Sequence, residues 1–268
     1  MKKISAGHRK LFDNTLMLYL LTFSNYFFSF ITVPFQTRIL GPEIYGNIGF
    51  ASSFMIYFSL ILDFGFLLSA TEDVSIYKDD SYRLSQIMTA VTLCKILLAG
   101  ITTLFFGILC VSVSRLRADP VLFILYYLSS LISAFLPDFL YRGLERMRAI
   151  TIRSVMARIF FTILIFIFLR EKEQYYLIPF FTLLGNIGAV VLVYFHVSRI
   201  LNVKFCRIKK EDVIYTLKKS SMFFYSRVAS TVYSATNTFV LGIIYGNSST
   251  TVGYYIAADK LVGTAKQG

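Results

Sequence analysis

The chain has 268 residues, of which 56% are hydrophobic and only 16% are charged, and its mean hydropathy is +0.65. A soluble domain of this length has too little interior to bury so much apolar surface, so the composition excludes an ordinary soluble protein. The formal net charge of +12 is scattered over short polar segments, which argues against a nucleic-acid-binding face.

Seven apolar stretches each reach the roughly 17–25 residues that an α-helix needs to cross a bilayer. In chain order they are Leu16–Gln36, Tyr45–Phe66, Leu84–Ser112, Val121–Phe139, Ile150–Leu169, Tyr175–Val197 and Ser220–Tyr245. An eighth begins near Thr251 and meets the end of the sequence at Gly268, short of a full crossing, which predicts a C-terminally truncated chain. The predicted fold class is all-α, as a polytopic membrane protein.

Lysine and arginine residues alternate in number between the polar segments. The N-terminal segment and every second loop carry four, two, four and seven, or 17 in total, whereas the intervening loops carry one, two, two and none, or five in total. Because positive residues collect in cytoplasmic loops, this bias predicts a cytoplasmic N-terminus and a multi-pass protein of the cell inner membrane.

The longest and most basic polar segment divides the chain into three parts. Residues 1–198 are predicted to form a first six-helix lobe, 199–219 a basic cytoplasmic linker, and 220–268 the start of a second lobe with span 7 and part of span 8. The leading helix of each lobe ends at a glycine-containing turn, which favours a parallel repeat. Unrelated helical hairpins also use glycine in this way, so that alternative stays open.

Two of the apolar stretches carry polar residues at steps of three and four, which place them on one helix face. The first stripe holds Thr22, Asn25, Ser29, Thr32 and Gln36, and the second holds Ser220, Arg227, Ser230, Ser234 and Asn237. Such stripes either hydrogen-bond to neighbouring helices or line a cavity between the two lobes. The full charge of Arg227 favours the cavity.

Three cations lie deep within the apolar stretches, namely Lys95, Arg158 and Arg227. A charge at mid-bilayer costs about 3 kcal/mol on insertion scales, so these side chains are expected to face a wet cavity that handles a large anion. The flexible stem of Lys95 also allows it to reach the interface. Asp63 is a candidate partner for one of the cations. Such an ion pair would be a structural clamp between helices, and neither of its groups would be free to bind substrate.

Nothing in the sequence predicts a metal site, a cofactor or a catalytic centre. Cys94, Cys110 and Cys206 form no ligand spacing, and the two histidines, His8 and His196, are far apart in the sequence. The outer loops are too short to house a catalytic domain, which disfavours an enzyme.

Four segments carry a resemblance to a known family. They are Pro34-x-x-x-Arg38-x-Leu40-Gly41-x-x-x-Tyr45-Gly46, Leu62-Asp63-Phe64-Gly65-Phe66-x-x-Ser69-Ala70-Thr71, Gly143-Leu144-Glu145-Arg146-Met147 followed by Arg158, and Val252-Gly253-Tyr254-Tyr255 to Ala258. In this order the chain resembles the polysaccharide-export or Wzx-type O-antigen flippases of the multidrug/oligosaccharidyl-lipid/polysaccharide (MOP) exporter superfamily.

The resemblance implies a MATE-like two-lobe helical transporter, of which this chain holds one lobe and the start of the other. It implies a lipid-linked substrate, undecaprenyl-diphosphate-linked oligosaccharide, and as partners the bilayer, a polysaccharide polymerase and chain-length proteins. The residues expected to line the substrate cavity are Asn25, Ser29, Gln36, Arg38, Lys95, Arg158, Arg227, Asn237 and Lys260. The candidates for ion coupling or an ion pair are Asp63 and Asp259.

Two other functions are weighed against this one. A cation-coupled multidrug exporter of the same superfamily would need carboxylates on the cavity face of the first span, which carries only Thr, Asn, Ser and Gln. A membrane polysaccharide polymerase or glycosyltransferase would need a large outer loop or clustered acidic residues, and the sequence has neither.

Overall fold

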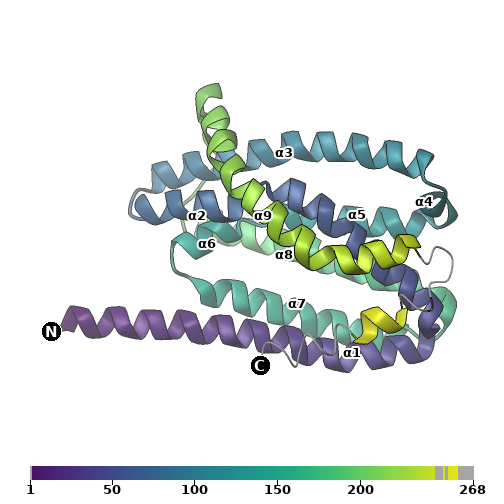
Figure 1. The fold of residues 1–268 in the computed structure, drawn as a ribbon. Coiled ribbons are helices and arrows are strands. Elements are labelled where there is room, and N and C mark those ends of the chain that lie inside the picture. The colour runs from purple at the N-terminus through teal and green to yellow at the C-terminus, as the bar shows by residue number, and fades with distance from the viewer. Residues whose placement is uncertain (1, 245–249, 251–252, 259–268) are drawn as a thin grey trace.

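The structure is a computed structural model that describes the backbone of residues 2–244, 250 and 253–258. Side chains are described for residues 11–231, 240, 241, 250 and 253–258. The described residues form helices joined by short connections and contain no strand, as the sequence predicts (Figure 1).

The first helix, α1 (Lys2–Asp63), is two arms joined at a sharp bend. Gly41 lies at the bend with φ 74° and ψ 166°, a conformation that is open essentially to glycine alone. Pro42 follows, and its fixed φ and missing N–H start the second arm. The first two predicted spans are therefore the two arms of one bent helix, with the bend in place of the expected outer loop.

A second break follows the second arm. Phe64 and Gly65 have φ values of 42° and 78°, after which the chain continues as α2 (Phe66–Ile76). The third span is the unbroken helix α3 (Ser81–Ser112), which begins where the Asp80 carboxylate accepts hydrogen bonds from the backbone N–H groups of Tyr82 and Arg83.

The fourth predicted span is broken as well. It consists of α5 (Pro120–Ala134) and α6 (Asp138–Gly143), separated by a turn at Phe135–Pro137. The remaining elements are the short helix α4 (Ser114–Ala118), α7 (Met147–Phe168), a 3-10 turn (Lys172–Tyr176), α8 (Leu177–Arg199) and α9 (Lys210–Ile244).

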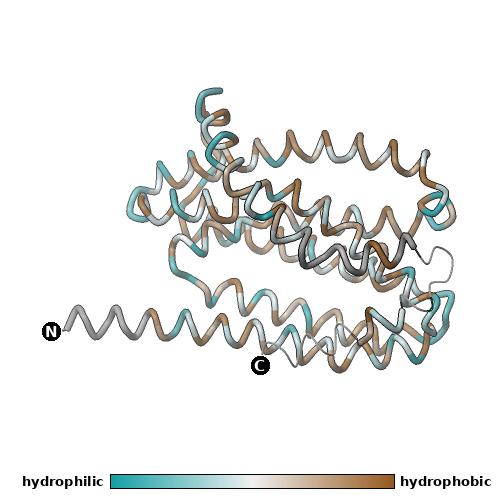
Figure 2. The backbone as a smooth tube through the Cα atoms, viewed as in Figure 1, coloured by the Kyte–Doolittle hydropathy of each residue, from teal (hydrophilic) through white to brown (hydrophobic). Residues whose placement is uncertain are grey.

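Five helical segments in the described part of the chain are long and apolar enough to cross a membrane, and the first of them, Leu11–Ile76, holds both arms of α1. Large apolar side chains such as Leu104, Leu192 and Phe195 point outwards, and hydrophobic positions run along both sides of α3 (Figure 2). This apolar outer surface is that of a multi-pass membrane protein. Helix α9 is less apolar and is not one of the five, although the seventh predicted span lies within it.

The connections between helices collect at two opposite ends of the molecule. The α2–α3, α6–α7 and α8–α9 connections lie towards the left of Figure 1, whereas the bend of α1, helix α4 and the α7–α8 connection lie at the right. The segments predicted to be cytoplasmic thus share one end. Residues 253–258 are helical and pack at the opposite end, where Ile256 contacts Val33 and Tyr45.

Two apolar clusters hold helices α1 to α8 together, one towards each end. The cluster near the bend of α1 includes Leu40, Phe58 and Tyr127, and the other, around α2 and α6, includes Phe66 and Leu140. The polar cavities described next lie among the helices that these clusters hold together.

Candidate functional site

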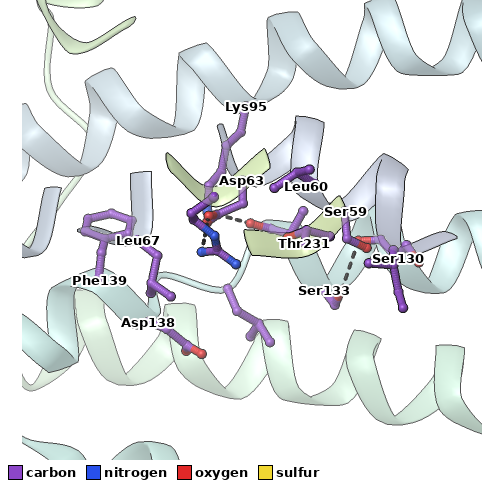
Figure 3. Close-up of a pocket in the computed structure, with 14 residues that line it drawn as sticks. Ser59, Leu60, Asp63, Leu67, Lys95, Ser130, Ser133, Asp138, Phe139 and Thr231 are labelled. Carbon is purple, nitrogen blue, oxygen red and sulfur yellow. Dashed lines mark hydrogen bonds and ion pairs between the residues drawn. The ribbon is translucent and has the colours of Figure 1, made fainter. Parts of the chain in front are cut away.

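A cavity of about 320 Å³ lies where α9 meets α1, α3, α5 and α6 (Figure 3). Both helix breaks contribute to it, since Asp63 ends the second arm of α1 and Asp138 begins α6. The other polar side chains that line it are Ser59, Lys95, Ser130, Ser133, Arg227 and Thr231. Figure 3 shows Asp63 and Lys95 close together, with Asp138 farther along the cavity. The cavity therefore brings together charged groups from four helices, α1, α3, α6 and α9.

Arg227 is paired with Asp63 in this cavity. Its Nη1 donates a hydrogen bond to Asp63 Oδ2 at 2.7 Å, which joins α9 to the second arm of α1 across 164 residues of sequence. The side chains are 35% and 24% exposed, so the pair borders the cavity instead of lying beneath it. Asp63 is thus paired with Arg227, one of the three cations for which the sequence made it a candidate partner.

Lys95 is buried, with 5% of its surface exposed. Its Nζ donates to the carbonyl oxygen of Ala134, the last residue of α5, and lies 5.6 Å from the centroid of the Phe139 ring. A cation at a helix C-terminus is favoured because the free carbonyl groups carry a partial negative charge. Lys95 therefore points into the protein and does not extend to the membrane interface.

Sequence reasoning missed the second carboxylate of the cavity. Asp138 accepts hydrogen bonds from both Arg153 Nη1 at 2.7 Å and Arg153 Nη2 at 3.1 Å, a bidentate pair between α6 and α7. The signal was an acidic residue inside the apolar stretch Val121–Phe139, directly after Pro137. Arg153 lies within α7, and only 14% of its side chain is exposed.

Arg158 lies elsewhere, between two further cavities of about 330 and 210 Å³ that are lined mainly by α1, α7 and α8. The larger is lined by polar residues of α7 and α8, including Ser154, Thr182 and Asn186. Within the described part of the chain, Arg158 has no hydrogen bond or ion pair. This guanidinium group is a half-buried cation whose five donors are available to a ligand.

The polar stripe of the first span belongs with Arg158. Ser29, Thr32 and Gln36 line the smaller cavity beside it, and they do not line the cavity of Arg227. The Ser29 and Thr32 hydroxyls donate to carbonyl oxygens of their own helix, whereas Thr162 Oγ1 and Asn25 Oδ1 are buried without a hydrogen-bond partner in the structure. The residues expected to line one cavity are thus distributed between the cavity of Arg227 and the two cavities beside Arg158.

The other predicted site residues lie outside these three cavities or outside the described residues. Arg38 is exposed near the bend of α1. Asn237 has its backbone in α9, but its side chain lies outside the described residues, as do Asp259 and Lys260 entirely. In the described part of the chain, no group of three or more His, Cys, Asp or Glu side chains is arranged to hold a metal ion.

Comparisons with known proteins identify the family to which this chain belongs. A protein of Escherichia coli (strain K12) named "Putative O-antigen transporter" is 27% identical over 248 residues, which cover 92% of this chain and 59% of that protein. A protein of Shigella dysenteriae with the same name is 28% identical over 254 residues, covering 92% of this chain and 62% of that protein. The chain thus spans about three-fifths of the length of these curated relatives. No solved structure matches at a significant level. Residues 11–268 match the family described as "Polysaccharide biosynthesis protein", and since this match covers nearly the whole sequence, the chain belongs to that family.

Proposed function

We propose that this chain belongs to a flippase that translocates undecaprenyl-diphosphate-linked oligosaccharide across the bacterial inner membrane. The protein would work by alternating access and would supply repeat units for O-antigen, capsule or exopolysaccharide export. Family membership and the names of the two relatives support a role in polysaccharide transport. The cationic side chains Lys95, Arg227 and Arg158, which line the cavities, support an anionic substrate.

The observation that carries the proposal is the state of Arg158. A cation in the interior of an apolar helix is costly unless it has a role, and this one has no carboxylate partner among the described residues. Guanidinium groups form bidentate, charge-assisted hydrogen bonds to phosphate. The hydroxyl and amide groups around it, from Ser154, Thr182 and Asn186, suit sugar or phosphate oxygens.

The proposed organisation follows the sequence-based division of the chain. Residues 1–198 form the first lobe, 199–219 a basic cytoplasmic linker, and 220–268 the start of the second lobe, with the N-terminus in the cytoplasm. The last ten linker residues, Lys210–Lys219, are the first turns of α9. A polysaccharide polymerase and chain-length proteins are the expected partners.

The two alternatives receive less support. A cation-coupled drug exporter needs available carboxylates. Both acidic residues of the cavity lined by Asp63, Asp138 and Arg227, here called the main cavity, are paired with arginines.

A polymerase or glycosyltransferase needs acidic residues clustered for catalysis. A further cavity of about 390 Å³ does hold Glu72, Asp73 and Asp212, but Glu72 and Asp73 form ion pairs with Lys219.

Complementation of a strain that lacks its O-antigen flippase tests the proposal. In an intact-length protein, Arg158→Ala should abolish surface polysaccharide, and Arg158→Lys should restore part of it because the charge survives while the planar fork is lost. Met156→Ala is the matched control, since this residue of the same helix is 60% exposed on the apolar surface. Immunoblots of membranes verify equal insertion. Failure of the wild-type protein would overturn the function, and full activity of Arg158→Ala would overturn the role of Arg158.

A further inference from the structure

The two arginine–carboxylate pairs of the main cavity differ in their geometry. Arg153 holds Asp138 with two hydrogen bonds, at 2.7 and 3.1 Å, whereas Arg227 holds Asp63 with one hydrogen bond, at 2.7 Å. A bidentate pair is stronger and more rigid than a single charge-assisted bond. The Arg227 side chain is also more exposed than that of Arg153, at 35% against 14%, so the Asp63–Arg227 pair is the one that a ligand entering the cavity can displace.

Lys95 lies beside this pair without a carboxylate of its own. No carboxylate oxygen of the described residues comes within salt-bridge distance of its Nζ, although Asp63 and Asp138 both act on it electrostatically. Since Asp138 is neutralised by Arg153, the cavity contains one other carboxylate and two cations, Lys95 and Arg227, and is net positive by one charge. A buried charge is costly unless it is balanced. Lys95 can therefore balance Asp63 whenever Arg227 does not.

Helix α9 stays attached to the first lobe even if Arg227 releases Asp63. The Ser220 and Ser69 hydroxyls are 2.6 Å apart, and Lys219 Nζ lies 2.7 Å from Asp73 Oδ1 and 3.2 Å from Glu72 Oε1. These contacts lie two turns before Arg227, about 12 Å along the helix axis. Loss of the Asp63 contact would thus free the Arg227 side chain without detaching the helix.

We propose that Asp63 sets the ligand selectivity of this cavity by occupying Arg227 until a diphosphate displaces it, whereupon Lys95 balances the charge of Asp63. The inference rests on the proposed function and names the part of the substrate that this cavity recognises. A neutral sugar cannot compete with a carboxylate for a guanidinium group, and a monophosphate carries less charge than a diphosphate. The carboxylate therefore acts as a filter against weaker anions.

Binding of defined lipids to the purified intact-length protein in nanodiscs, measured by native mass spectrometry, tests the inference. The probes are undecaprenyl diphosphate and undecaprenyl monophosphate. Asp63→Asn should bind both lipids about tenfold more tightly and should discriminate less between them, because the competing charge is gone. Asp63→Glu should resemble the wild type. Asp73→Asn is the matched control, because its partner is Lys219, in the N-terminal part of α9, and not Arg227.

Substitution of Lys95 distinguishes an indirect effect on binding, through the charge of Asp63, from direct contact between Lys95 and phosphate. Lys95→Met should weaken diphosphate binding about tenfold in the wild-type background and should have no effect in the Asp63→Asn background. An equal effect of Lys95→Met in both backgrounds would overturn the inference, and so would unchanged binding by Asp63→Asn. If the folded wild-type protein binds neither lipid, the proposed function itself is overturned.

Discussion

Gly65 and Ser220 bring the backbones of the helix break and of α9 into direct contact. A Cβ atom on Gly65 would lie 2.7 Å from the carbonyl oxygen of Ser220 and 2.8 Å from the backbone nitrogen of Phe224. Gly65 also has a φ of 78°, so both its conformation and its surroundings require glycine. This contact sets how closely α9 approaches the break, and thereby the position of Arg227 beside Asp63.

Gly65→Ala should therefore destabilise the protein. Left-handed backbone alone costs an alanine about 1–2 kcal/mol, and the clash with the α9 backbone adds to this cost. The measurement is thermal unfolding of the purified protein in detergent. Gly100→Ala is the matched control, because Gly100 is in the interior of α3 with no atom within 4 Å of an added Cβ, and it should leave the melting temperature unchanged or raise it. Equal melting temperatures for the wild type and Gly65→Ala would contradict the prediction.

Arg153 and Arg158 lie five residues apart on α7 and should respond differently to removal. Arg153→Ala leaves the Asp138 carboxylate without its bidentate partner in the protein interior, so it should lower the free energy of unfolding by about 1–3 kcal/mol. Arg158→Ala removes a cation with no partner among the described residues and should leave that free energy nearly unchanged or raise it. Thermal unfolding of both variants checks this contrast, and a larger loss for Arg158→Ala than for Arg153→Ala would refute it.

Hydropathy and motifs were enough to predict the fold class and the family. The seven predicted spans lie mostly in helices, although the second and the fourth each contain a helix break, and the match over residues 11–268 confirms the family that the four motif segments indicated. The two breaks were not predicted because hydropathy is continuous across them. Only Gly65 and Pro137 mark the breaks in the sequence, and in apolar helices such residues are often tolerated without a break.

The arrangement of the candidate site could not be predicted from the sequence. Helical periodicity shows which residues share a face, but not which helix that face meets. The stripe with Ser29 and Gln36 therefore gave no sign that Arg158, and not Arg227, would lie beside it. The pairing of Asp63 with Arg227 spans 164 residues, and sequence alone left both clamp and substrate roles open.

The ion pairs that Lys219, in the N-terminal part of α9, forms with Asp73 and Glu72 can be tested by their effect on stability. Burial lowers the pKa of Lys219, but the hydrogen bonds and charges of Asp73 and Glu72 outweigh this effect and raise the pKa above its ordinary value of 10.5. A raised lysine pKa gives a stabilisation that is fully present below the ordinary value and is lost only as the pH rises through the folded-state value. Lys219→Met should therefore lower the melting temperature equally at about pH 6 and about pH 8. The exposed neighbour Lys218 supplies the control, since Lys218→Met should have no effect at either pH. A loss confined to one of the two pH values would show that a different group titrates.

The proposed orientation predicts where reporter fusions to the intact-length protein will be found. Fusions at Lys78, Glu145 and Lys210 should report the cytoplasm, because these residues lie in or border the α2–α3, α6–α7 and α8–α9 connections, which share one end of the molecule. Fusions at Glu171, in the α7–α8 connection at the other end, and at Asn247 should report the periplasm. The expectation rests on the 17 positive residues of one side against five of the other. Paired alkaline phosphatase and green fluorescent protein fusions give opposite signals on the two sides, so each site is read twice. Reversed signals at two or more sites would contradict both the orientation and the division into six helices and a second lobe.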